Sequence, residues 1–253
     1  MIQILSDIHS EMMTTDDVKT LCDKILTPSS EKEIDVILAG DIGNPYTDSY
    51  KYILEQCSNK YRRVFICTGN HEYYHSIDVN YIDDSITKLC ELYNNVYFLN
   101  KQKYEFDDMV ILGCTLWTFI PDEFKRVITS SMNDYNYIPD FNVIEQNKLH
   151  EEHINWLKSE IEQIDTDKKV IVVTHHLPTF KLIDEMYKNS NLNYAFANTD
   201  CNELFKSVDY WICGHTHKYA NIVIDDCTLI VNPIGYPDEN TLYKHVEIQL
   251  GKK

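Results

Sequence analysis

The first ten residues, MIQILSDIHS (1–10), join a short apolar run to a carboxylate and an imidazole. The run IQIL (2–5) is apolar apart from Gln3, which is common for a strand that is buried on both faces. Asp7 and His9 follow two residues apart, at the point where that strand would end. One such pair proves little, so its meaning depends on whether the rest of the chain supplies partners for it.

Further runs of the same kind each end in Gly, Asp, Asn or His. They are DVILA (35–39) before GDIG, RVFICT (63–68) before GNHEYY, KVIVVT (169–174) before HHLP, and DYWIC (209–213) before GHTHK. Segments 16–27 and 49–60 are long enough for helices, and a spacing of about 30 residues between the first runs predicts βαβ units in a largely parallel sheet. Ligand sites gather at the carboxyl ends of such strands, so these strand ends can converge on one point.

The remaining segments have weaker patterns. NVYFLN, QKYEFDD and MVILGCTLWTF (94–119) predict consecutive strands in a meander, and ANIVIDD, CTLIVNP and YKHVEIQL (220–250) predict a similar set. These strands would form a second sheet or antiparallel additions to the first. Apolar residues at helical spacing predict an amphipathic helix within 141–165, whereas 121–140 has no clear period and predicts a long loop.

The polar residues at the strand ends form a set that is typical of transition-metal sites. Imidazole, carboxylate and amide oxygen together suit Mn, Fe, Zn, Co or Ni better than Ca or a metal that prefers thiolates. The set is too large for one zinc ion, but it suits two ions about 3.5–4 Å apart that share a bridging carboxylate and clamp a phosphoryl group. Gly40, Gly69 and Gly214 each precede a candidate ligand, where they would let the backbone turn sharply.

The ordered series D-x-H, G-D, G-N-H-E, H and G-H-x-H, across residues 7 to 217, resembles the signature of the calcineurin-like metallophosphoesterases. The resemblance implies an α/β fold in which a two-sheet β-sandwich is flanked by helices in four α/β/β/α layers, and it agrees with the two-sheet interpretation. It also implies two divalent transition-metal ions (Mn, Fe, Zn or Ni). Asp7, His9 and His217 would bind one ion, Asn70, His175 and His215 the other, Asp41 would bridge both, and His71 would lie beside them without ligating.

His71 is the candidate catalytic residue, because a histidine beside a dinuclear site can protonate a leaving group. Its orienting carboxylate stays open between Glu72 and the acidic loops. His176 is adjacent to His175, so only one of the two can point into the site from an extended backbone. Contact with substrate and bracing of the loop are both open for His176, and Asn133 and Tyr135 in the 121–140 segment are further candidates for substrate binding.

Composition limits the class of protein. A length of 253 residues predicts a single domain over 1–253, and the net charge of −17 argues against broad nucleic-acid binding. No apolar run approaches the roughly 18 residues of a membrane span, and the N-terminus does not resemble a signal peptide. The eight scattered cysteines predict buried free thiols in a reducing compartment, and therefore a cytoplasmic protein.

The leading functional hypothesis is a metal-dependent phosphoesterase in which a metal-bound hydroxide attacks a small phosphorylated substrate. Family likeness does not fix monoester against diester. His9 in D-x-H keeps open a phosphodiesterase that acts on a small nucleotide-like molecule, as in the cyclic-nucleotide branch that this chain resembles in size and spacing. A phosphomonoesterase or protein phosphatase is the alternative. A DNA nuclease and a non-catalytic scaffold of the same fold are less favoured, because the chain is acidic and no ligand position is lost. The physiological substrate and the oligomeric state stay open.

Overall fold

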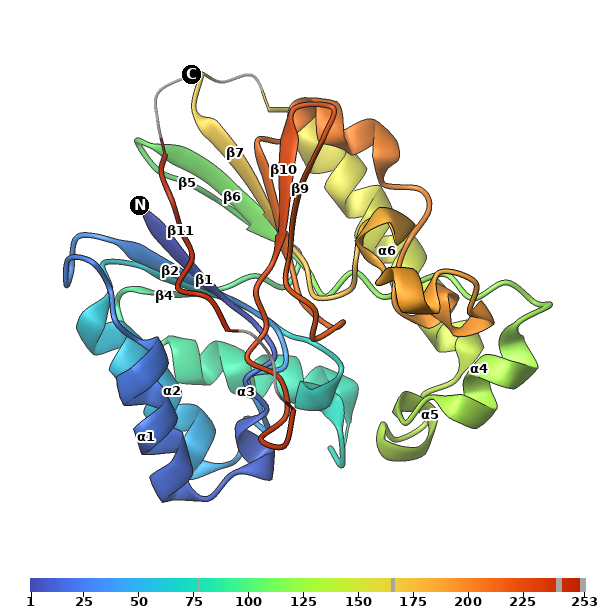
Figure 1. The fold of residues 1–253 in the computed structure, drawn as a ribbon, viewed down its shortest axis with the longest axis horizontal. Helices are drawn as coiled ribbons and strands as arrows, with labels where there is room; N and C mark the ends of the chain where they lie inside the picture. Colours follow the sequence, from blue (N-terminus) through green and yellow to red (C-terminus); the bar gives the residue numbers. More distant parts are fainter. Residues whose placement is uncertain (77, 165–166, 240–242, 251–253) are drawn as a thin grey trace.

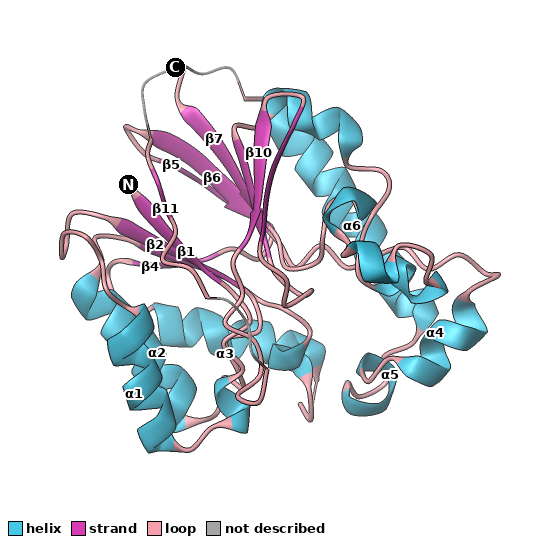
Figure 2. Ribbon diagram, in the orientation of Figure 1, coloured by secondary structure: helices cyan, strands magenta, loops and turns pink. Residues whose placement is uncertain are grey.

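The computed structural model describes residues 1–76, 78–164, 167–239 and 243–250. Two mixed sheets face each other, and helices cover their outer faces (Figures 1 and 2). The strand order is β11-β1-β2-β3-β4 in the first sheet and β5-β6-β7-β8-β10-β9 in the second. The predicted four-layer α/β/β/α sandwich is confirmed.

The first sheet contains the strands that precede the N-terminal candidate ligands. β1 (Ile2–Leu5), β2 (Asp35–Ala39), β3 (Val64–Cys67) and β4 (Val96–Phe98) run parallel. The short strand β11 (Glu247–Ile248) pairs antiparallel with β1. Helices α1 (Thr15–Ile25), α2 (Asp48–Lys60) and α3 (Val79–Cys90) connect the parallel strands in turn, which gives the predicted βαβ units.

The second sheet contains the strands that precede the C-terminal candidate ligands. β6 (Met109–Gly113), β7 (Lys169–Val173), β8 (Tyr210–Cys213) and β10 (Cys227–Val231) run parallel. β5 (Gln102–Glu105) and β9 (Ala220–Ile224) close the two edges as antiparallel partners. The long helix α6 (Val143–Glu162) lies along the outer face of this sheet (Figure 1).

The predicted meander over 94–119 is wrong. β4 belongs to the first sheet, because α3 joins it to β3 as one more βαβ unit, whereas β5 and β6 form a hairpin in the second sheet. The segment 220–250 is divided in the same way: β9 and β10 form a hairpin, and β11 returns to the first sheet. Apolar alternation predicts a strand but not its partner, so the sequence could not assign these strands to sheets.

Alternating side chains of each strand separate the layers of the core. Ile4 and Ile37 point between the sheets and pack with Ile171 and Ile212 of the second sheet. Their neighbours in sequence, such as Leu38, point outward to the helices. Local signals start these helices: Thr14 and Asp17 form a capping box at α1, and the Asn142 side chain accepts the N–H groups of the first turn of α6.

The segment 121–140 is not a continuous loop. It contains the short helices α4 (Lys125–Ser131) and α5 (Asp134–Tyr137), which are too short to show a helical period in the sequence. Between β7 and β8 the chain makes 3-10 turns, among them η3 (Phe180–Leu182), η4 (Glu185–Tyr187) and η5 (Asn191–Ala195). α4 packs against η5, where Phe124 and Tyr194 stack with ring centroids 4.7 Å apart. These two segments therefore form one unit beside the strand ends.

Two composition-based expectations can be compared with the structure. All eight cysteines are buried and free, as predicted. Within the described residues, no helix combines the length and apolar character needed to cross a bilayer.

An ion-pair cluster joins the two sheets at the amino ends of their strands. Asp35, the first residue of β2, is fully buried and accepts two hydrogen bonds from each of Arg62 and Arg63, at 2.6–3.0 Å. Arg63 also donates to Asp108, which directly precedes β6 of the second sheet. Removing one partner of a buried ion pair leaves an uncompensated charge, which is more costly than losing an exposed pair.

We expect Asp35→Ala to lower the free energy of unfolding by about 3–5 kcal/mol, the usual loss for one member of a buried ion pair. Urea unfolding followed by circular dichroism measures this change. Asp16→Ala is the matched control, because the Asp16 side chain is 91% exposed and pairs with Lys19 on the same helix. Equal losses in the two variants would show that the cluster does not hold the sheets together.

Candidate metal centre

Left-handed backbone conformations direct the candidate ligands toward one another. Asp7, His9, Asp41, His215 and His217 have φ angles of 54°, 51°, 52°, 73° and 46°. This region costs a residue with a side chain roughly 1–2 kcal/mol. Strained residues of this kind cluster at functional sites, where the surrounding fold holds them in place. The strained turns therefore indicate a functional site at the carboxyl ends of β1, β2 and β8.

The three glycines that precede ligands serve two purposes. Only Gly40 has a positive φ, of +85°, so the expected sharp turn applies to this residue alone. A Cβ at Gly69 would lie 2.1 Å from Asp41 Oδ1, and one at Gly214 would lie 2.7 Å from Asp7 Oδ2. Gly69 and Gly214 are thus needed because the ligand side chains occupy the space where their own side chains would be.

The first cluster contains Asp7, His9 and His217, which offer ligand atoms within 4.8 Å of one another. Nε2 of His9 and Nε2 of His217 are 2.9 Å apart, and Nε2 of His217 lies 3.6 Å from Asp7 Oδ1. Asp7 is held in place because its two oxygens accept hydrogen bonds from Ser6 Oγ and from the N–H of His215. These are the three residues expected to bind one ion.

The second cluster contains Asp41, His175 and His215, again with ligand atoms within 4.8 Å. Asn70 Oδ1 lies 3.2 Å from Nε2 of His175, which brings the predicted amide ligand to the same place. Nε2 of His215 is buried and has no hydrogen-bond partner among the described residues. A buried polar atom without a partner is costly, so this nitrogen fits a role as a ligand for an ion.

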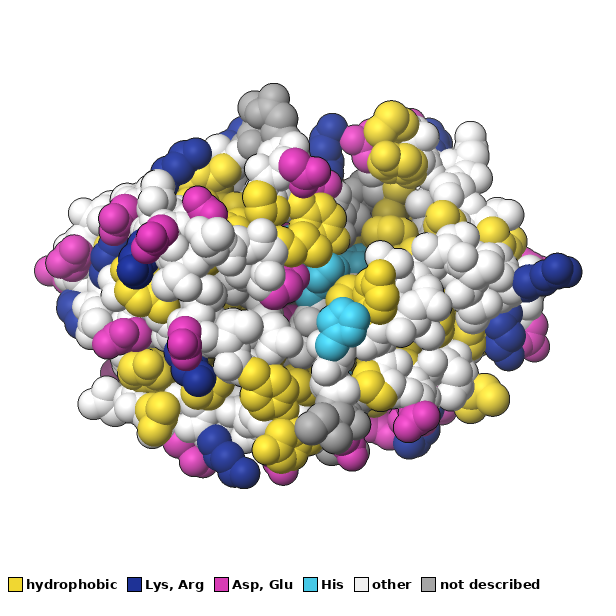
Figure 3. Space-filling view, turned by 90° about the horizontal axis from the view of Figure 1, so that it is seen from below, with side chains coloured by type: hydrophobic (Ala, Val, Ile, Leu, Met, Phe, Trp, Pro, Cys, Tyr) yellow, Lys and Arg dark blue, Asp and Glu magenta, His cyan; other side chains and the backbone are white. Residues whose placement is uncertain are grey.

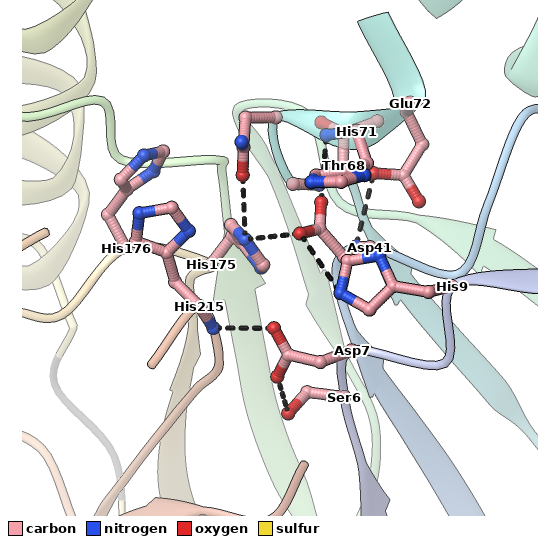
Figure 4. Close-up of polar contacts among 12 residues, drawn as sticks. Ser6, Asp7, His9, Asp41, Thr68, His71, Glu72, His175, His176 and His215 are labelled. Atoms are coloured by element: carbon pink, nitrogen blue, oxygen red, sulfur yellow. Dashed lines mark hydrogen bonds and ion pairs between the residues drawn. The ribbon is translucent and has the colours of Figure 1, made fainter. Parts of the chain in front are cut away.

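Asp41 lies between the two clusters. Its Oδ2 atom is 3.8 Å from Nε2 of His9 and 3.3 Å from Nε2 of His175 (Figure 4). Figure 4 shows the two imidazoles on opposite sides of this carboxylate. The second oxygen, Oδ1, accepts the backbone N–H of His71 at 2.9 Å, which fixes the carboxylate plane. One oxygen of Asp41 thus faces both clusters, as a bridging ligand requires.

The Nδ1 atoms of three histidines are anchored so that their Nε2 atoms face the clusters. His175 Nδ1 lies 2.9 Å from the carbonyl oxygen of Ala39, which can only accept. His9 Nδ1 contacts Glu11, and His217 Nδ1 contacts Glu239 at 2.5 Å. Such outer partners fix the tautomer and orientation of metal-binding histidines.

Electrostatics link the protonation states of the buried groups. Burial opposes ionisation of Asp41, but the charges of His175 and His71 hold the pKa of Asp41 well below its usual range. Burial likewise opposes a charge on His175, yet Asp41 raises the pKa of His175 to about 10. Burial and the neighbouring His176 keep the pKa of His215 well below its usual value, so His215 is neutral.

His71 lies beside both clusters, and its orienting acid is Glu11. His71 Nδ1 is 2.9 Å from Glu11 Oε1, and the same oxygen contacts His9. Burial lowers the pKa of His71, but Asp41 and the Glu11 hydrogen bond raise that pKa to about 9. Glu72 does not orient His71: its buried carboxylate accepts the N–H groups of Asp41, Ile42 and Gly69 and so braces the turn after β2.

Two further residues at the site were not predicted from the sequence. The hydroxyl of Tyr236 lies 3.3 Å from Nε2 of His71, and its ring packs against His9 with centroids 4.3 Å apart. Glu239 contacts His217, as described above, and also accepts the N–H of Tyr236. Both follow β10 by several residues, and no motif in this part of the chain signals them.

Asp134 of α5 reaches the second cluster from the 121–140 segment. It is buried and accepts a hydrogen bond from Asn70 Nδ2 at 2.8 Å and from the Tyr74 hydroxyl at 2.6 Å. Because Asp134 can accept from the amide nitrogen, it turns the carbonyl oxygen of Asn70 toward His175. Asp134 therefore orients the amide of Asn70, the predicted amide ligand.

The predicted substrate-binding residues are not all at the cavity. A cavity of about 600 Å³ adjoins the clusters, and Asn133 is among its lining residues. Tyr135 packs on Phe141 and its hydroxyl donates to Gln146, so it belongs to the core beside the cavity. His176 is fully buried against Trp117 and His215 and does not line the cavity. The structure therefore brings only Asn133 of these three to the cavity wall.

Comparison with known proteins places the chain in a class and then in a family. A four-layer sandwich with Asp, Asn and His gathered at its strand ends is the arrangement expected of a metal-dependent phosphoesterase. The family model of the calcineurin-like phosphoesterases matches residues 2–219, and the chain belongs to this family. The predicted resemblance is confirmed.

Two relatives show how far the similarity extends. The uncharacterized protein L509 of Acanthamoeba polyphaga mimivirus is 29% identical over 260 residues, which cover 94% of this chain and 92% of that protein. The crystal structure of phosphopantetheinyl hydrolase (PptH) from Mycobacterium tuberculosis is similar with a TM-score of 0.75 and 15% identity, over 97% of this chain and 95% of that one. At this identity the second likeness shows the fold alone.

We expect Asp134→Ala to weaken binding of a divalent cation at the second cluster by about 10–100-fold, the usual effect of losing an outer partner. The physical reason is that the Asn70 amide nitrogen then loses its carboxylate acceptor and keeps the Tyr74 hydroxyl at 3.0 Å, which holds the amide less firmly. Titration of metal-free protein with Mn²⁺ or Zn²⁺ in a calorimeter measures this. Asp134→Asn is the control, because its amide oxygen can still accept from Asn70. Unchanged affinity in Asp134→Ala would remove Asp134 from the site.

Proposed function

We propose that the protein is a metal-dependent phosphoesterase with two divalent transition-metal ions, of which Mn, Fe, Zn and Ni are the candidates. The observation that supports this most directly is the position of Asp41 Oδ2 between Nε2 of His9 and Nε2 of His175. The donor set of carboxylate, amide and imidazole suits these metals, and the unpartnered Nε2 of His215 among the described residues agrees with it. When bound, the two ions would neutralise phosphate charge and lower the pKa of an attacking water.

The residues of the chain divide the work of hydrolysis. Asp7, His9 and His217 hold one side of the centre, Asn70, His175 and His215 hold the other, and Asp41 keeps the two sides at a fixed separation. His71 stands beside this set with its Nε2 toward the Tyr236 hydroxyl and its Nδ1 on Glu11. Protonated His71 can therefore donate from Nε2 to the oxygen of a departing alcohol, while Glu11 stabilises its charge.

The proposed substrate is a small phosphodiester, with a phosphomonoester as the alternative. The cavity of about 600 Å³ is of the size that small molecules occupy. The net charge of −17 disfavours long-range attraction of a nucleic acid, and the free buried thiols agree with a cytoplasmic location. A non-catalytic scaffold is the competing function, and metal content together with turnover distinguishes the two.

The proposal predicts that Asp41→Asn nearly abolishes turnover and lowers metal occupancy at both positions, because an amide cannot share a negative charge between two cations. Protein stripped with a chelator and reloaded with Mn, Zn, Ni or Fe would be analysed for metal by mass spectrometry. The same samples would be assayed against phosphomonoesters and phosphodiesters, including cyclic nucleotides. An active Asp41→Asn enzyme with two full equivalents of metal would exclude the bridging role.

His71→Ala should behave differently from the ligand variants. Metal content should stay at the wild-type level while kcat falls by about 10²–10⁴-fold, the usual contribution of a general acid. The loss in kcat should be smaller for nitrophenyl esters, because the nitrophenolate group leaves without being protonated. Glu11→Gln should show a smaller loss with the same dependence on the leaving group, since it acts through His71. A loss of metal from His71→Ala would mean that His71 is a ligand instead.

A further inference from the structure

The cavity beside the clusters has two unlike sides. One side is the candidate metal centre, with Asp41, Asn70 and His71 at its surface. Another part of the lining consists of apolar side chains from the end of α4 and from the turns between β7 and β8; we call it the distal wall. It contains Met132, Ile183, Leu192 and Phe196, and the Phe196 ring packs against His215 with centroids 4.7 Å apart, where the wall meets the metal centre. Figure 3 shows histidine side chains in the middle of this face of the molecule, with hydrophobic side chains around them.

The distal wall is formed by the segment around α4 and by the turns between β7 and β8. Met132 follows α4, and Leu192 belongs to η5, which packs against α4. Their side chains are partly buried against the small apolar cluster of Ile120, Ile128 and Val143. The wall is therefore an apolar surface that this cluster supports from behind, and its residues also line the cavity.

The charges that line the cavity leave little to attract a second anionic group. Lys218 is the one lysine or arginine among the described residues that line it, and its Nζ lies 2.8 Å from Asp184 Oδ2. Glu239 also lines the cavity, but it contacts His217 and so belongs to the side of the metal centre. A phosphate or carboxylate placed near the distal wall would have to displace Asp184 from Lys218 to gain a cation among the described lining residues.

We infer that the substrate carries a single phosphoryl group and an uncharged, largely apolar organic group that lies against the distal wall. This inference rests on the proposed phosphoesterase function and names its substrate class. It predicts that esters with one phosphate are substrates, whereas nucleoside diphosphates, triphosphates and other polyphosphates are not. Each methylene group of the substrate that is buried against the wall should strengthen binding by about fourfold, because apolar surface is removed from water.

A series of alkyl p-nitrophenyl phosphates tests the inference, because every member releases the same leaving group. The alkyl arm is methyl, butyl or hexyl, and a further member has a butyl arm that ends in a second phosphate. For the metal-loaded protein we expect kcat/KM to rise at least tenfold from methyl to butyl. The member with the second phosphate should fall at least tenfold below the butyl ester.

A cation added to the wall should reverse this preference. In Leu192→Lys, kcat/KM should fall for the butyl ester and rise for the member with the second phosphate. Ile183→Lys places a cation on another part of the wall, and serves if Leu192→Lys fails to fold. Leu92→Lys is the matched control, because Leu92 is 73% exposed and does not line the cavity. Circular dichroism checks the fold of each variant.

The outcomes distinguish this inference from the proposed function. If the methyl ester is hydrolysed but kcat/KM does not depend on the arm, the phosphoesterase stands and the inference fails. Preference of the wild-type protein for the second phosphate would overturn it as well. If no ester is hydrolysed, the proposed function fails. The distal wall can still be tested by measuring in a calorimeter how tightly methylphosphonate and butylphosphonate bind. Equal affinities for the two would overturn the inference.

Discussion

A carboxylate buried among imidazoles is the constraint on which this structure depends. Asp41 is 2% exposed, so little water reaches its charge. Burial of an unpaired charge is so costly that cations or hydrogen-bond donors must surround it. The fold meets this need from both sheets, with His9 from the first and His175 from the second. Three features bring these groups to one carboxylate. They are the strained turns, the glycines without room for a side chain, and Glu72, which braces the turn after β2.

The strands and the converging residues were accessible to sequence analysis for a simple reason. A strand buried on both faces is apolar at nearly every position, so its end is visible where the polar residues begin. β1, β2, β3, β7 and β8 all begin and end close to the predicted runs. Each candidate ligand lies within a few residues of such an end, and the structure brings them together. Their binding of metal and the catalytic role of His71 stay predictions.

The partners of these residues were not accessible in the same way. Asp134 meets Asn70 across 64 residues, and Glu11 meets His71 across 60, so no local pattern connects them. Tyr236 and Glu239 lie outside the ordered motifs, and their roles follow only from the return of the chain after β10. The predicted meander of β4, β5 and β6 was wrong for the same reason, because strand pairing is a contact between distant segments and β4 pairs in the other sheet.

The two ends of the sandwich are closed by different chemistry. At the amino ends of the strands, Asp35, Arg63 and Asp108 join the sheets through side chains that are always present. At the carboxyl ends each cluster also draws its atoms from both sheets, and hydrogen bonds from the His215 N–H to Asp7 and between His175 Nδ1 and the Ala39 carbonyl oxygen join the sheets there. A bound ion would add an exchangeable link to this end. Loss of such an ion would loosen the carboxyl ends more than the amino ends, and amide hydrogen exchange would then rise most around the strand ends that carry Asp7, His175 and His215.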